Sequence, residues 1–325
     1  MTKRFPVAGN VPAVVTPFGP DGDLRLDAFE ALVAWHVAQG VDGVCIAGDN
    51  GESWTLSVDE RRRLALAAVR VAAGRIPVVM GASATTARQS IAYAEAVADT
   101  GVAALMIGPQ PYVMKATTRE LVQRLETVHR AVPLPMLLYN SPRRTNISLT
   151  VETMRAICDA VPVIALKEAS RDFFYLTHVI HHFRDRLAVM IGPAPFILPG
   201  LQLGAAGFIS SGPELLGGRA ARIMALASGA MTEEARGIQE GVPAEEIGAR
   251  GQRVLVRGKD ASTELSPRAS HLRQTAILAP VDADPPSHRP THSLTHPRPY
   301  PAALGPQPTH RPAEAAGLHR RRRAG

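Results

Sequence analysis

The sequence predicts an α/β protein of the (β/α)8 barrel class, and three observations support this prediction. Short apolar runs alternate with amphipathic stretches up to about Gly229. The alternation repeats eight times over about 220 residues, which matches the plan of a (β/α)8 barrel. No Gly-rich dinucleotide-binding motif follows the first apolar run, and this argues against a doubly wound open sheet, the competing fold.

The apolar runs are the predicted strands, and the amphipathic stretches between them are the predicted helices. In chain order, the predicted strands are Val11–Phe18, Gly43–Gly48, Pro77–Ala82, Ala103–Gly108, Pro135–Ser141, Val163–Ser170, Leu187–Gly192 and Gly207–Gly212. The predicted helices are Asp27–Gln39, Ser57–Ala73, Thr86–Thr100, Thr118–Ala131, Thr150–Ala160, Phe173–Phe183, Pro195–Leu203 and Glu214–Ser228. Ser57 and Glu60 have the spacing of a capping box. Gly40, Gly74 and Gly101 stand just past helix ends, where a left-handed residue is favoured.

The composition changes near residue 240, so we expect residues 1–240 to form the catalytic barrel and residues 241–325 to form a tail. The tail holds 12 of the 27 prolines and is rich in Arg and His, a composition that favours disorder. Enrichment in Arg, Pro, Ala and His also suggests a frame-shifted reading of GC-rich DNA. The rival explanation is a genuine basic tail that binds a polyanion.

The net charge of +7 comes almost entirely from this tail, which carries 13 of the 36 basic residues and 7 of the 29 acidic ones. The barrel is therefore nearly neutral, which argues against a nucleic-acid site on it. The sequence has no apolar run long enough to span a membrane and no signal peptide. Cys45 and Cys158 lack metal-ligand spacing, so we expect reduced core residues in a cytoplasmic protein.

Lys167 is the first candidate catalytic residue. It lies in an apolar strand, and the side-chain alternation of a strand places it on one face with Ala165 and Ala169, with Ile164 and Leu166 on the other. Burial among small apolar residues favours the neutral, nucleophilic amine that forms a Schiff base with a carbonyl. The alternative is a lysine whose stem lies along the strand while its ammonium group reaches solvent or an ion pair.

Polar residues gather where predicted strands end, which is where (β/α)8 enzymes place their chemistry. Tyr139 is expected to face the barrel interior beside Lys167, and Arg144 follows in the next loop. A tyrosine can relay protons and an arginine can bind a carboxylate through two hydrogen bonds, a set suited to Schiff-base chemistry on a keto acid. Taken singly, Tyr139 could be a core aromatic and Arg144 a partner in a surface ion pair.

Four blocks of sequence resemble the dihydrodipicolinate synthase / N-acetylneuraminate lyase family of pyruvate-dependent class I aldolases. They are Gly48–Glu52, Tyr139–Thr145, the strand lysine Lys167 and Gly207–Ser210, in the family's order within roughly residues 7–239. The resemblance implies a lyase without metal or cofactor that forms an imine between Lys167 and pyruvate.

The resemblance also implies roles for other residues. Tyr139 would donate and accept the proton, and Arg144 would hold the carboxylate of the second substrate. Ile209 and the loop at Gly51 would frame the pyruvate end of the site. The chain would form a homodimer or homotetramer, in which residues around Tyr112 approach the site of a neighbouring subunit.

The sequence departs from the synthase of this family at Asp49 and Asn50, where Thr-Thr is usual. The second of these positions is the one expected to join the proton relay, and Asn50 can bind a carboxylate but cannot pass on a proton as a hydroxyl does. Asp49 could bind a substrate hydroxyl or cap its own loop. Val113 takes the place expected for the synthase's tyrosine after strand 4, although Tyr112 precedes it.

These departures favour a catabolic lyase that acts on pyruvate or a 2-keto-3-deoxy acid, with an aldehyde or sugar acid as its partner. Two alternatives are 4-hydroxy-tetrahydrodipicolinate synthase itself and a non-catalytic barrel that binds a keto acid. Outside the site, His178, His181 and His182 have helical spacing and are interpreted as surface residues rather than metal ligands. Trp54 could line the pocket or pack over the barrel mouth.

Overall fold

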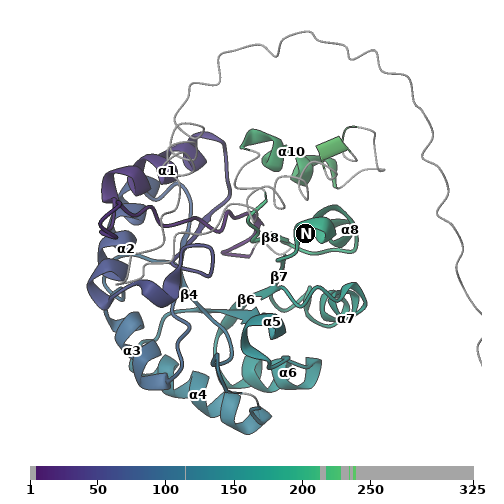
Figure 1. Ribbon diagram of the computed structural model, residues 1–325. Helices are drawn as coiled ribbons and strands as arrows, with labels where there is room; N and C mark the ends of the chain where they lie inside the picture. Colours follow the sequence, from purple (N-terminus) through teal and green to yellow (C-terminus); the bar gives the residue numbers. More distant parts are fainter. Residues whose placement is uncertain (1–4, 114, 213–216, 228–233, 235–236, 239–325) are drawn as a thin grey trace, which may run out of the picture. The chain divides into compact units, whose positions relative to one another are not determined.

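The computed structural model is a barrel of parallel strands surrounded by helices (Figure 1), and it describes residues 5–113, 115–212, 217–227, 234 and 237–238. The strands are β1 Gly9–Asn10, β2 Val44–Ile46, β3 Val78–Gly81, β4 Ala104–Ile107, β5 Met136–Asn140, β6 Val163–Glu168, β7 Ala188–Ile191 and β8 Gly207–Phe208. The α-helices are α1 Leu26–Ala38, α2 Val58–Ala72, α3 Ala87–Glu95, α4 Thr118–Ala131, α5 Pro142–Thr145, α6 Val151–Ala160, α7 Phe173–Phe183, α8 Ile197–Gln202 and α10 Gly218–Leu226. Two short 3-10 helices are η1 Ser53–Thr55 and η2 Ala194–Phe196. The predicted tail, residues 241–325, lies outside the described residues.

The eight strands follow the order β1-β8-β7-β6-β5-β4-β3-β2, and every pairing in the sheet is parallel. Three backbone hydrogen bonds join the first and last strands of this order: Asp42 N donates to Asn10 O, Cys45 N to Pro12 O, and Val14 N to Cys45 O, each at 2.9 Å. The sheet therefore closes on itself, and the predicted (β/α)8 barrel is confirmed.

The first strand is shorter and earlier than predicted. The sequence indicated Val11–Phe18, whereas regular strand pairing covers Gly9–Asn10. Within the predicted run there are two isolated bridges, a parallel one between Ala13 and Cys45 and an antiparallel one between Phe18 and Leu24. Proline has no N–H to donate to a strand ladder, and Pro12 and Pro17 interrupt the predicted run. The apolar pattern marked the right region, but the prolines prevent a continuous ladder.

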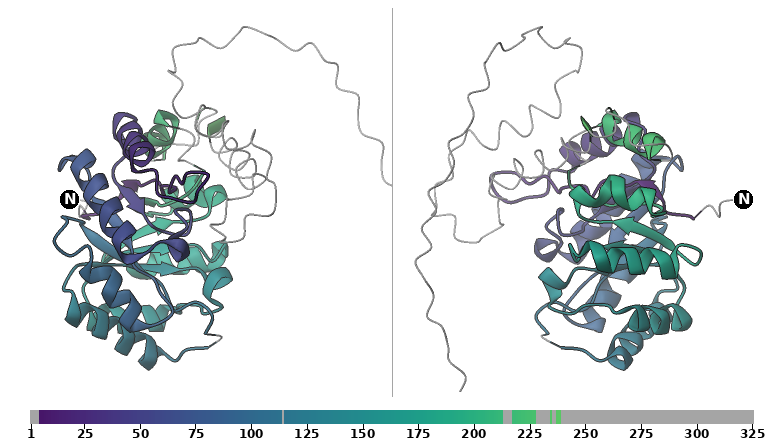
Figure 2. Two further views of the ribbon diagram at one scale, coloured as in Figure 1. Left: turned by 60° about the vertical axis from the view of Figure 1, so that its left-hand side comes forward. Right: turned by 90° about the vertical axis from the view of Figure 1, so that its right-hand side faces the viewer.

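Two apolar cores lie on the two sides of the barrel wall. The larger one fills the space between the strands and the outer helices, which Figure 2 shows packed around the sheet. The smaller one fills the barrel interior, with Cys45, Val79, Met106, Leu137 and Ala165 among its members. The alternation of strand side chains produces this division, since Leu137 and Ala165 face inward while Leu138 and Leu166 face the helices.

Strand β6 contains one irregularity that the alternation rule missed. Met136 pairs with Val163, but Leu137 pairs with Ala165, so Ile164 is an extra residue at a β-bulge. Ile164 consequently packs against the interior core. Strand alternation alone had predicted it on the opposite face, with Leu166. Beyond the bulge the alternation is regular, and Ala165 and Lys167 share the inner face as expected.

The capping box and the glycines after α1 and α2 are confirmed, whereas α3 ends at Glu95, six residues before Gly101, and not at Thr100 as predicted. Ser57 and Glu60 form the capping box at the start of α2, with Glu60 N donating to Ser57 Oγ at 3.2 Å. Gly40, Gly74 and Gly101 have φ values of +74°, +71° and +90°, in the left-handed region that glycine adopts at low cost. In the part of the chain that the structure describes, no helix has the length and apolar character needed to cross a membrane.

Candidate active site

Lys167 lies near the carboxyl end of β6 and points into the barrel. Lys167 is only 8% exposed. Its neighbours on the inner face of the wall include Ala165 on the same strand and Met190 on β7. Lys167 Nζ lies 4.7 Å from the centre of the Tyr139 ring, so the ring face covers one side of the amino group.

Tyr139 is the register partner of Lys167 on β5. Its hydroxyl donates a hydrogen bond to Asp49 Oδ2 at 3.0 Å. Burial, and then the negative charge of Asp49, raise the pKa of Tyr139 well above its usual value, whereas a hydrogen bond with Ser141 opposes the shift. The phenol therefore stays protonated near neutral pH.

Asp49 connects Tyr139 with Arg144. The Nε atom of Arg144 lies 3.3 Å from Asp49 Oδ2, the oxygen that also accepts from Tyr139. Arg144 lies on α5, a short helix that begins at Pro142, where the sequence predicted a loop. Proline favours the first helical position because its φ is fixed and no N–H is needed there. This turn carries Arg144 from the end of β5 toward the loop that follows β2.

The loop after β2 is fixed against the segment that follows β1. Thr16 Oγ1 donates to Gly51 O at 2.7 Å, and Asn50 Nδ2 donates to Ala13 O at 3.3 Å. A Cβ atom at Gly51 would lie 3.0 Å from both Thr16 Oγ1 and Val14 O, so a larger residue would push the loop out of place.

The expectation that the second loop position, Asn50, stands at the relay is corrected by these contacts. Asp49 meets the tyrosine hydroxyl, whereas the Asn50 side chain hydrogen-bonds to the backbone of Ala13. The direction of each side chain depends on the turn of the loop, which residue types alone did not reveal.

A sulfur-rich wall lies below this loop. Cys45 Sγ lies 3.8 Å from Met106 Sδ, and a Cβ at Gly48 would lie 3.1 Å from Met106 Cε. Burial raises the pKa of the Cys45 thiol to about 11, although the nearby Lys167 cation opposes the shift. Cys45 is therefore a neutral thiol that fills space. Ile209, directly after β8, is fully buried in the same interior core.

Behind Lys167 lies a buried polar cluster that the sequence interpretation missed. Glu168 Oε2 accepts from Asn140 Nδ2 at 2.6 Å, and Glu168 Oε1 accepts from Ser170 N at 2.6 Å. Asn140 Oδ1 in turn accepts from Leu149 N at 3.0 Å. Burial raises the pKa of Glu168, and its hydrogen bonds with Ser170 and Asn140 oppose that shift. The polar pair Asn140 and Glu168, each directly after an inward catalytic candidate, was the signal that could have identified this cluster.

Other predicted residues lie on the surface. Tyr112 is 96% exposed with φ +72°, so in this chain it does not line the buried end of the site beside Lys167. Its approach to a neighbouring subunit stays a prediction. Trp54, in η1, is also exposed. His178, His181 and His182 are exposed on α7 as predicted, and no group of metal-ligating residues occurs within the described ranges.

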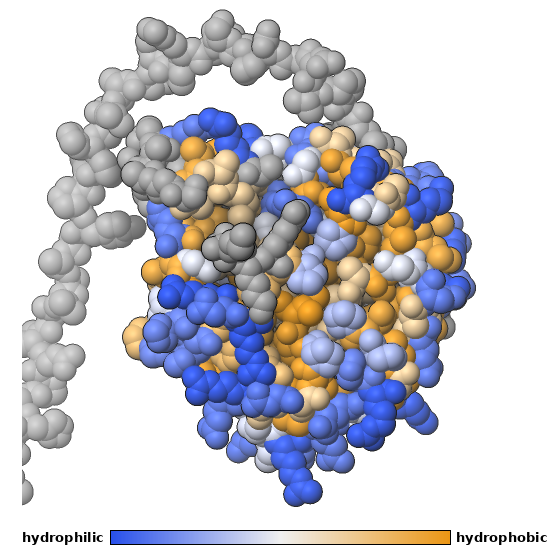
Figure 3. Space-filling model, turned by 180° about the vertical axis from the view of Figure 1, so that it is seen from behind, coloured by the Kyte–Doolittle hydropathy of each residue, from blue (hydrophilic) through white to orange (hydrophobic). Residues whose placement is uncertain are grey.

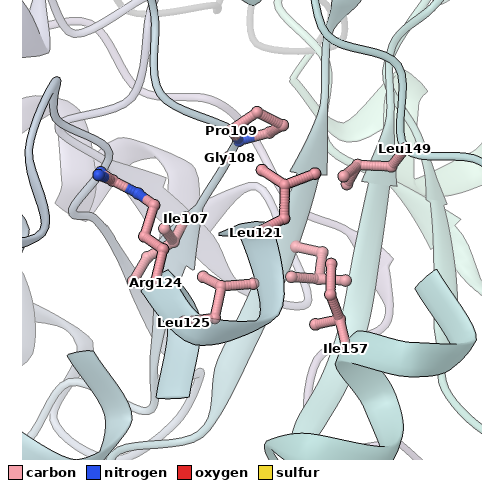
Figure 4. A pocket seen from close by; sticks show the side chains of 9 residues that line it. Ile107, Gly108, Pro109, Leu121, Arg124, Leu125, Leu149 and Ile157 are labelled. Atoms are coloured by element: carbon pink, nitrogen blue, oxygen red, sulfur yellow. The ribbon is translucent and has the colours of Figure 1, made fainter. Parts of the chain in front are cut away.

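A separate small cavity lies on the helix side of the barrel wall (Figure 4), and Lys167 is not among the residues that line it. Its volume is about 10 Å³, and it is lined by Ile107, Gly108, Pro109, Leu121, Arg124, Leu125, Leu138, Leu149 and Ile157. This is scarcely room for one water molecule, and the lining is nearly all apolar. We interpret it as a packing gap.

The outer surface also carries apolar residues, which gather near the centre of the face drawn in Figure 3. Large exposed apolar side chains include Trp54, Leu66, Tyr112, Phe174 and Leu203.

Comparison with known proteins points to one family. A sequence model described as "Dihydrodipicolinate synthetase family" matches residues 6–244. A 4-hydroxy-tetrahydrodipicolinate synthase of Sorangium cellulosum is 38% identical over 210 residues, which are 64% of this chain and 69% of that protein.

Solved structures share the fold of this chain. A dihydrodipicolinate synthase of Aquifex aeolicus superposes with a TM-score of 0.72 and 24% identity over 84% of this chain and 97% of its own. The chloride-inhibited dihydrodipicolinate synthase of Acinetobacter baumannii, complexed with pyruvate, superposes with a TM-score of 0.72 and 25% identity. The match covers 83% of this chain and 98% of that protein.

Proposed function

The chain belongs to the dihydrodipicolinate synthetase family, whose members are lyases of the class I aldolase type, and from this premise we propose that Lys167 forms an imine with pyruvate or a 2-keto-3-deoxy acid. The observation that carries the proposal is the burial of the Lys167 amine against the Tyr139 ring at the carboxyl end of the barrel. The A. baumannii relative is described as complexed with pyruvate, which supports a keto acid as the first substrate.

In the first step, the Lys167 amine attacks the C2 carbonyl of pyruvate. A carbon–nitrogen bond forms, the carbonyl oxygen takes up protons and leaves as water, and a protonated imine remains. Tyr139 would deliver a proton, and two observations support this role: its raised pKa keeps its hydroxyl protonated, and its ring lies against Nζ.

In the second step, loss of a C3 proton converts the imine to an enamine. The enamine carbon attacks the carbonyl carbon of an aldehyde, so that a carbon–carbon bond forms and the aldehyde oxygen takes a proton. Water then hydrolyses the imine, releases the product and restores Lys167. Cleavage of a 2-keto-3-deoxy acid runs through the same steps in reverse.

The loop residues serve the pyruvate end of the site in this proposal. Backbone N–H groups of the loop at Asn50 and Gly51 would bind the pyruvate carboxylate, with the Asn50 amide as a further donor. Thr16 supports this role by holding the loop through Gly51 O. Ile209 would contact the apolar methyl group, in keeping with its complete burial in the interior core.

Reductive trapping tests the proposal. The full-length chain is incubated with pyruvate and sodium borohydride, and the modified residue is identified by peptide mass spectrometry. The expected result is a reduced adduct on Lys167 that disappears in Lys167→Ala and persists in Lys115→Ala, since Lys115 is exposed. Folded protein that gives no adduct on Lys167 would refute the Schiff-base mechanism.

A panel of aldehydes and sugar acids then separates the enzyme from a non-catalytic barrel that only binds a keto acid. The hydrogen-bonded Tyr139 hydroxyl next to Lys167 favours turnover. Imine formation without consumption or release of pyruvate by any substrate would favour the binding protein instead.

A further inference from the structure

We propose that Asp49 determines the second substrate, and that the site selects an uncharged aldehyde bearing hydroxyl groups over one bearing a carboxylate. This inference rests on the proposed function, because it concerns the partner that reacts with the Lys167 enamine. It differs from the expectation drawn from sequence, in which Arg144 would bind a carboxylate of that partner.

Arg144 already forms an ion pair with Asp49. Its Nε atom lies 3.3 Å from Asp49 Oδ2, so the protein itself supplies the carboxylate that a substrate would otherwise bring. A substrate carboxylate placed beside Arg144 would also face the negative charge of Asp49. Like charges at such a distance oppose binding, and they give a site selectivity by repulsion.

The two carboxylate oxygens of Asp49 differ in their hydrogen bonds. Oδ2 is engaged by both Tyr139 and Arg144, whereas Oδ1 receives no hydrogen bond from a described residue. The Asp49 side chain is 27% exposed, so it faces the mouth of the site. An ionised carboxylate only accepts hydrogen bonds, and its natural partner here is a donor such as a hydroxyl group.

Asp49 is also connected to the Lys167 amine through Tyr139. Asp49 accepts from the hydroxyl of Tyr139, whose ring covers the Lys167 amine. A group bound at Asp49 therefore lies next to the carbon that reacts, where the hydroxyls of a sugar-like aldehyde would be. An aldehyde with hydroxyls beside its carbonyl group fits this arrangement.

Two further arginines lie near Arg144 at the rim of the barrel. Arg143 and Arg171 are both exposed. Desolvation lowers the pKa of Arg171, and the positive charges of Arg143 and Arg144 lower it further. Among the described residues, Arg144 is the one that forms an ion pair with Asp49. The other two raise the positive potential at the entrance, which favours arrival of the keto acid. They do not change the balance of charge at Asp49 itself.

Three four-carbon aldehydes separate charge from hydroxyl content. Erythrose is neutral and hydroxylated, butanal is neutral without hydroxyls, and succinic semialdehyde carries a carboxylate. The measurement is kcat/KM for each in pyruvate-dependent condensation, followed by pyruvate consumption. The native chain is expected to prefer erythrose over both others by tenfold or more.

Asp49→Asn retains an oxygen that can accept from Tyr139 but removes the charge. The ratio of erythrose to succinic semialdehyde should fall at least tenfold, mainly through a lower KM for succinic semialdehyde. Adding Arg144→Gln to Asp49→Asn should abolish this gain, because Arg144 is then no longer available to the substrate. Asp185→Asn changes the same charge at an exposed position before β7 and should leave the ratio unchanged.

Trapping with borohydride accompanies each variant, so that imine formation and substrate choice are read separately. If Asp49→Asn gives no adduct, Asp49→Ser takes its place with the same expectation. A native chain that forms no imine refutes the proposed function. Three outcomes in a chain that does form the imine would overturn the assignment of Asp49. The native chain could use succinic semialdehyde as well as or better than erythrose, or the Asp49 variant could keep the native ratio of erythrose to succinic semialdehyde. The third outcome is that none of the three aldehydes condenses.

Discussion

Lys167 and Tyr139 are register partners on β6 and β5, and the lysine amine lies 4.7 Å from the centre of the tyrosine ring. Their relative position is therefore set by the hydrogen-bonded ladder of the barrel wall rather than by loops. On β5, the residues on each side of Tyr139 are Leu138, which packs against the helices, and Asn140, which binds Glu168. Catalytic groups placed on such a frame keep their geometry when substrates change.

Replacing Tyr139 by Phe should separate imine formation from turnover. The amine of Lys167 remains in place, so borohydride still traps pyruvate, while loss of the proton donor lowers kcat by about 10²–10⁴-fold. Single-turnover kinetics with pyruvate and an accepted aldehyde measure the two steps. Tyr93→Phe, on α3, is the matched control and should leave both unchanged. Full turnover in Tyr139→Phe would exclude the hydroxyl as the proton donor.

The titration of Tyr139 should respond to Asp49. The negative charge of Asp49 is one cause of the raised pKa of Tyr139, so Asp49→Asn lowers that pKa and the phenolate forms at a lower pH than in the native chain. Ultraviolet difference absorbance against pH measures this. In a Tyr139→Phe background, adding Asp49→Asn should leave the absorbance titration unchanged. A difference that persists there would trace the change to another tyrosine.

Gly81→Ala should distort the site from a distance. A Cβ at Gly81 would lie 2.0 Å from Ala47 O, in the backbone that leads into the Asp49 loop. We expect a loss of about 1–3 kcal/mol in the free energy of unfolding, as for other overpacked positions, together with lower kcat/KM. Gly218→Ala is the control, since the atom nearest to a Cβ there would be Gln39 Oε1 at 3.5 Å. Denaturant unfolding in which Gly81→Ala matches this control would contradict the close approach.

Glu168 should make stability depend on pH. Burial raises its folded pKa above the unfolded value, so the folded chain binds this proton more tightly. The resulting stabilisation is fully present below the unfolded pKa of about 4.3 and is lost as pH rises through the folded pKa. Urea midpoints measured across this range should fall with pH in the native chain.

In Glu168→Gln, residue 168 no longer contributes to the fall of the urea midpoint with rising pH. The variant should also lose about 1–3 kcal/mol at all pH values, because its amide group faces an N–H donor where an oxygen accepted before. The exposed Glu152→Gln is the control and should keep the native slope. An unaltered slope in Glu168→Gln would show that other groups cause the dependence.

The sequence predicted most of the barrel because its strands and helices differ in apolar period. Helix α4 matches its predicted bounds, Thr118–Ala131, and α7 matches Phe173–Phe183. The errors lie where local rules compete. The prolines at 12 and 17 shortened the first strand, and a bulge turned Ile164 inward.

The site was predictable in its residue types but not in its contacts. Lys167 and Tyr139 follow from strand alternation, which fixes the face of each side chain. The pairing of Asp49 with Tyr139 and Arg144 depends on loop backbone angles, and Glu52 at the end of that loop has φ +52°. Such angles depend on tertiary contacts, which the order of residues in a loop does not determine.

The candidate site has two parts that are held by different strands, and the short strand β1 supports only one of them. Lys167 and Tyr139 belong to β6 and β5, which pair along five residues of β5, whereas Asn50 and Gly51 are attached through side-chain bonds to the segment after a two-residue strand. Damage to the seam between β1 and its neighbours would therefore release the loop before it disturbs the amine and the phenol. The amine and the phenol on one side, and the loop at residues 50–51 on the other, thus rest on parts of the barrel that can fail, and evolve, separately.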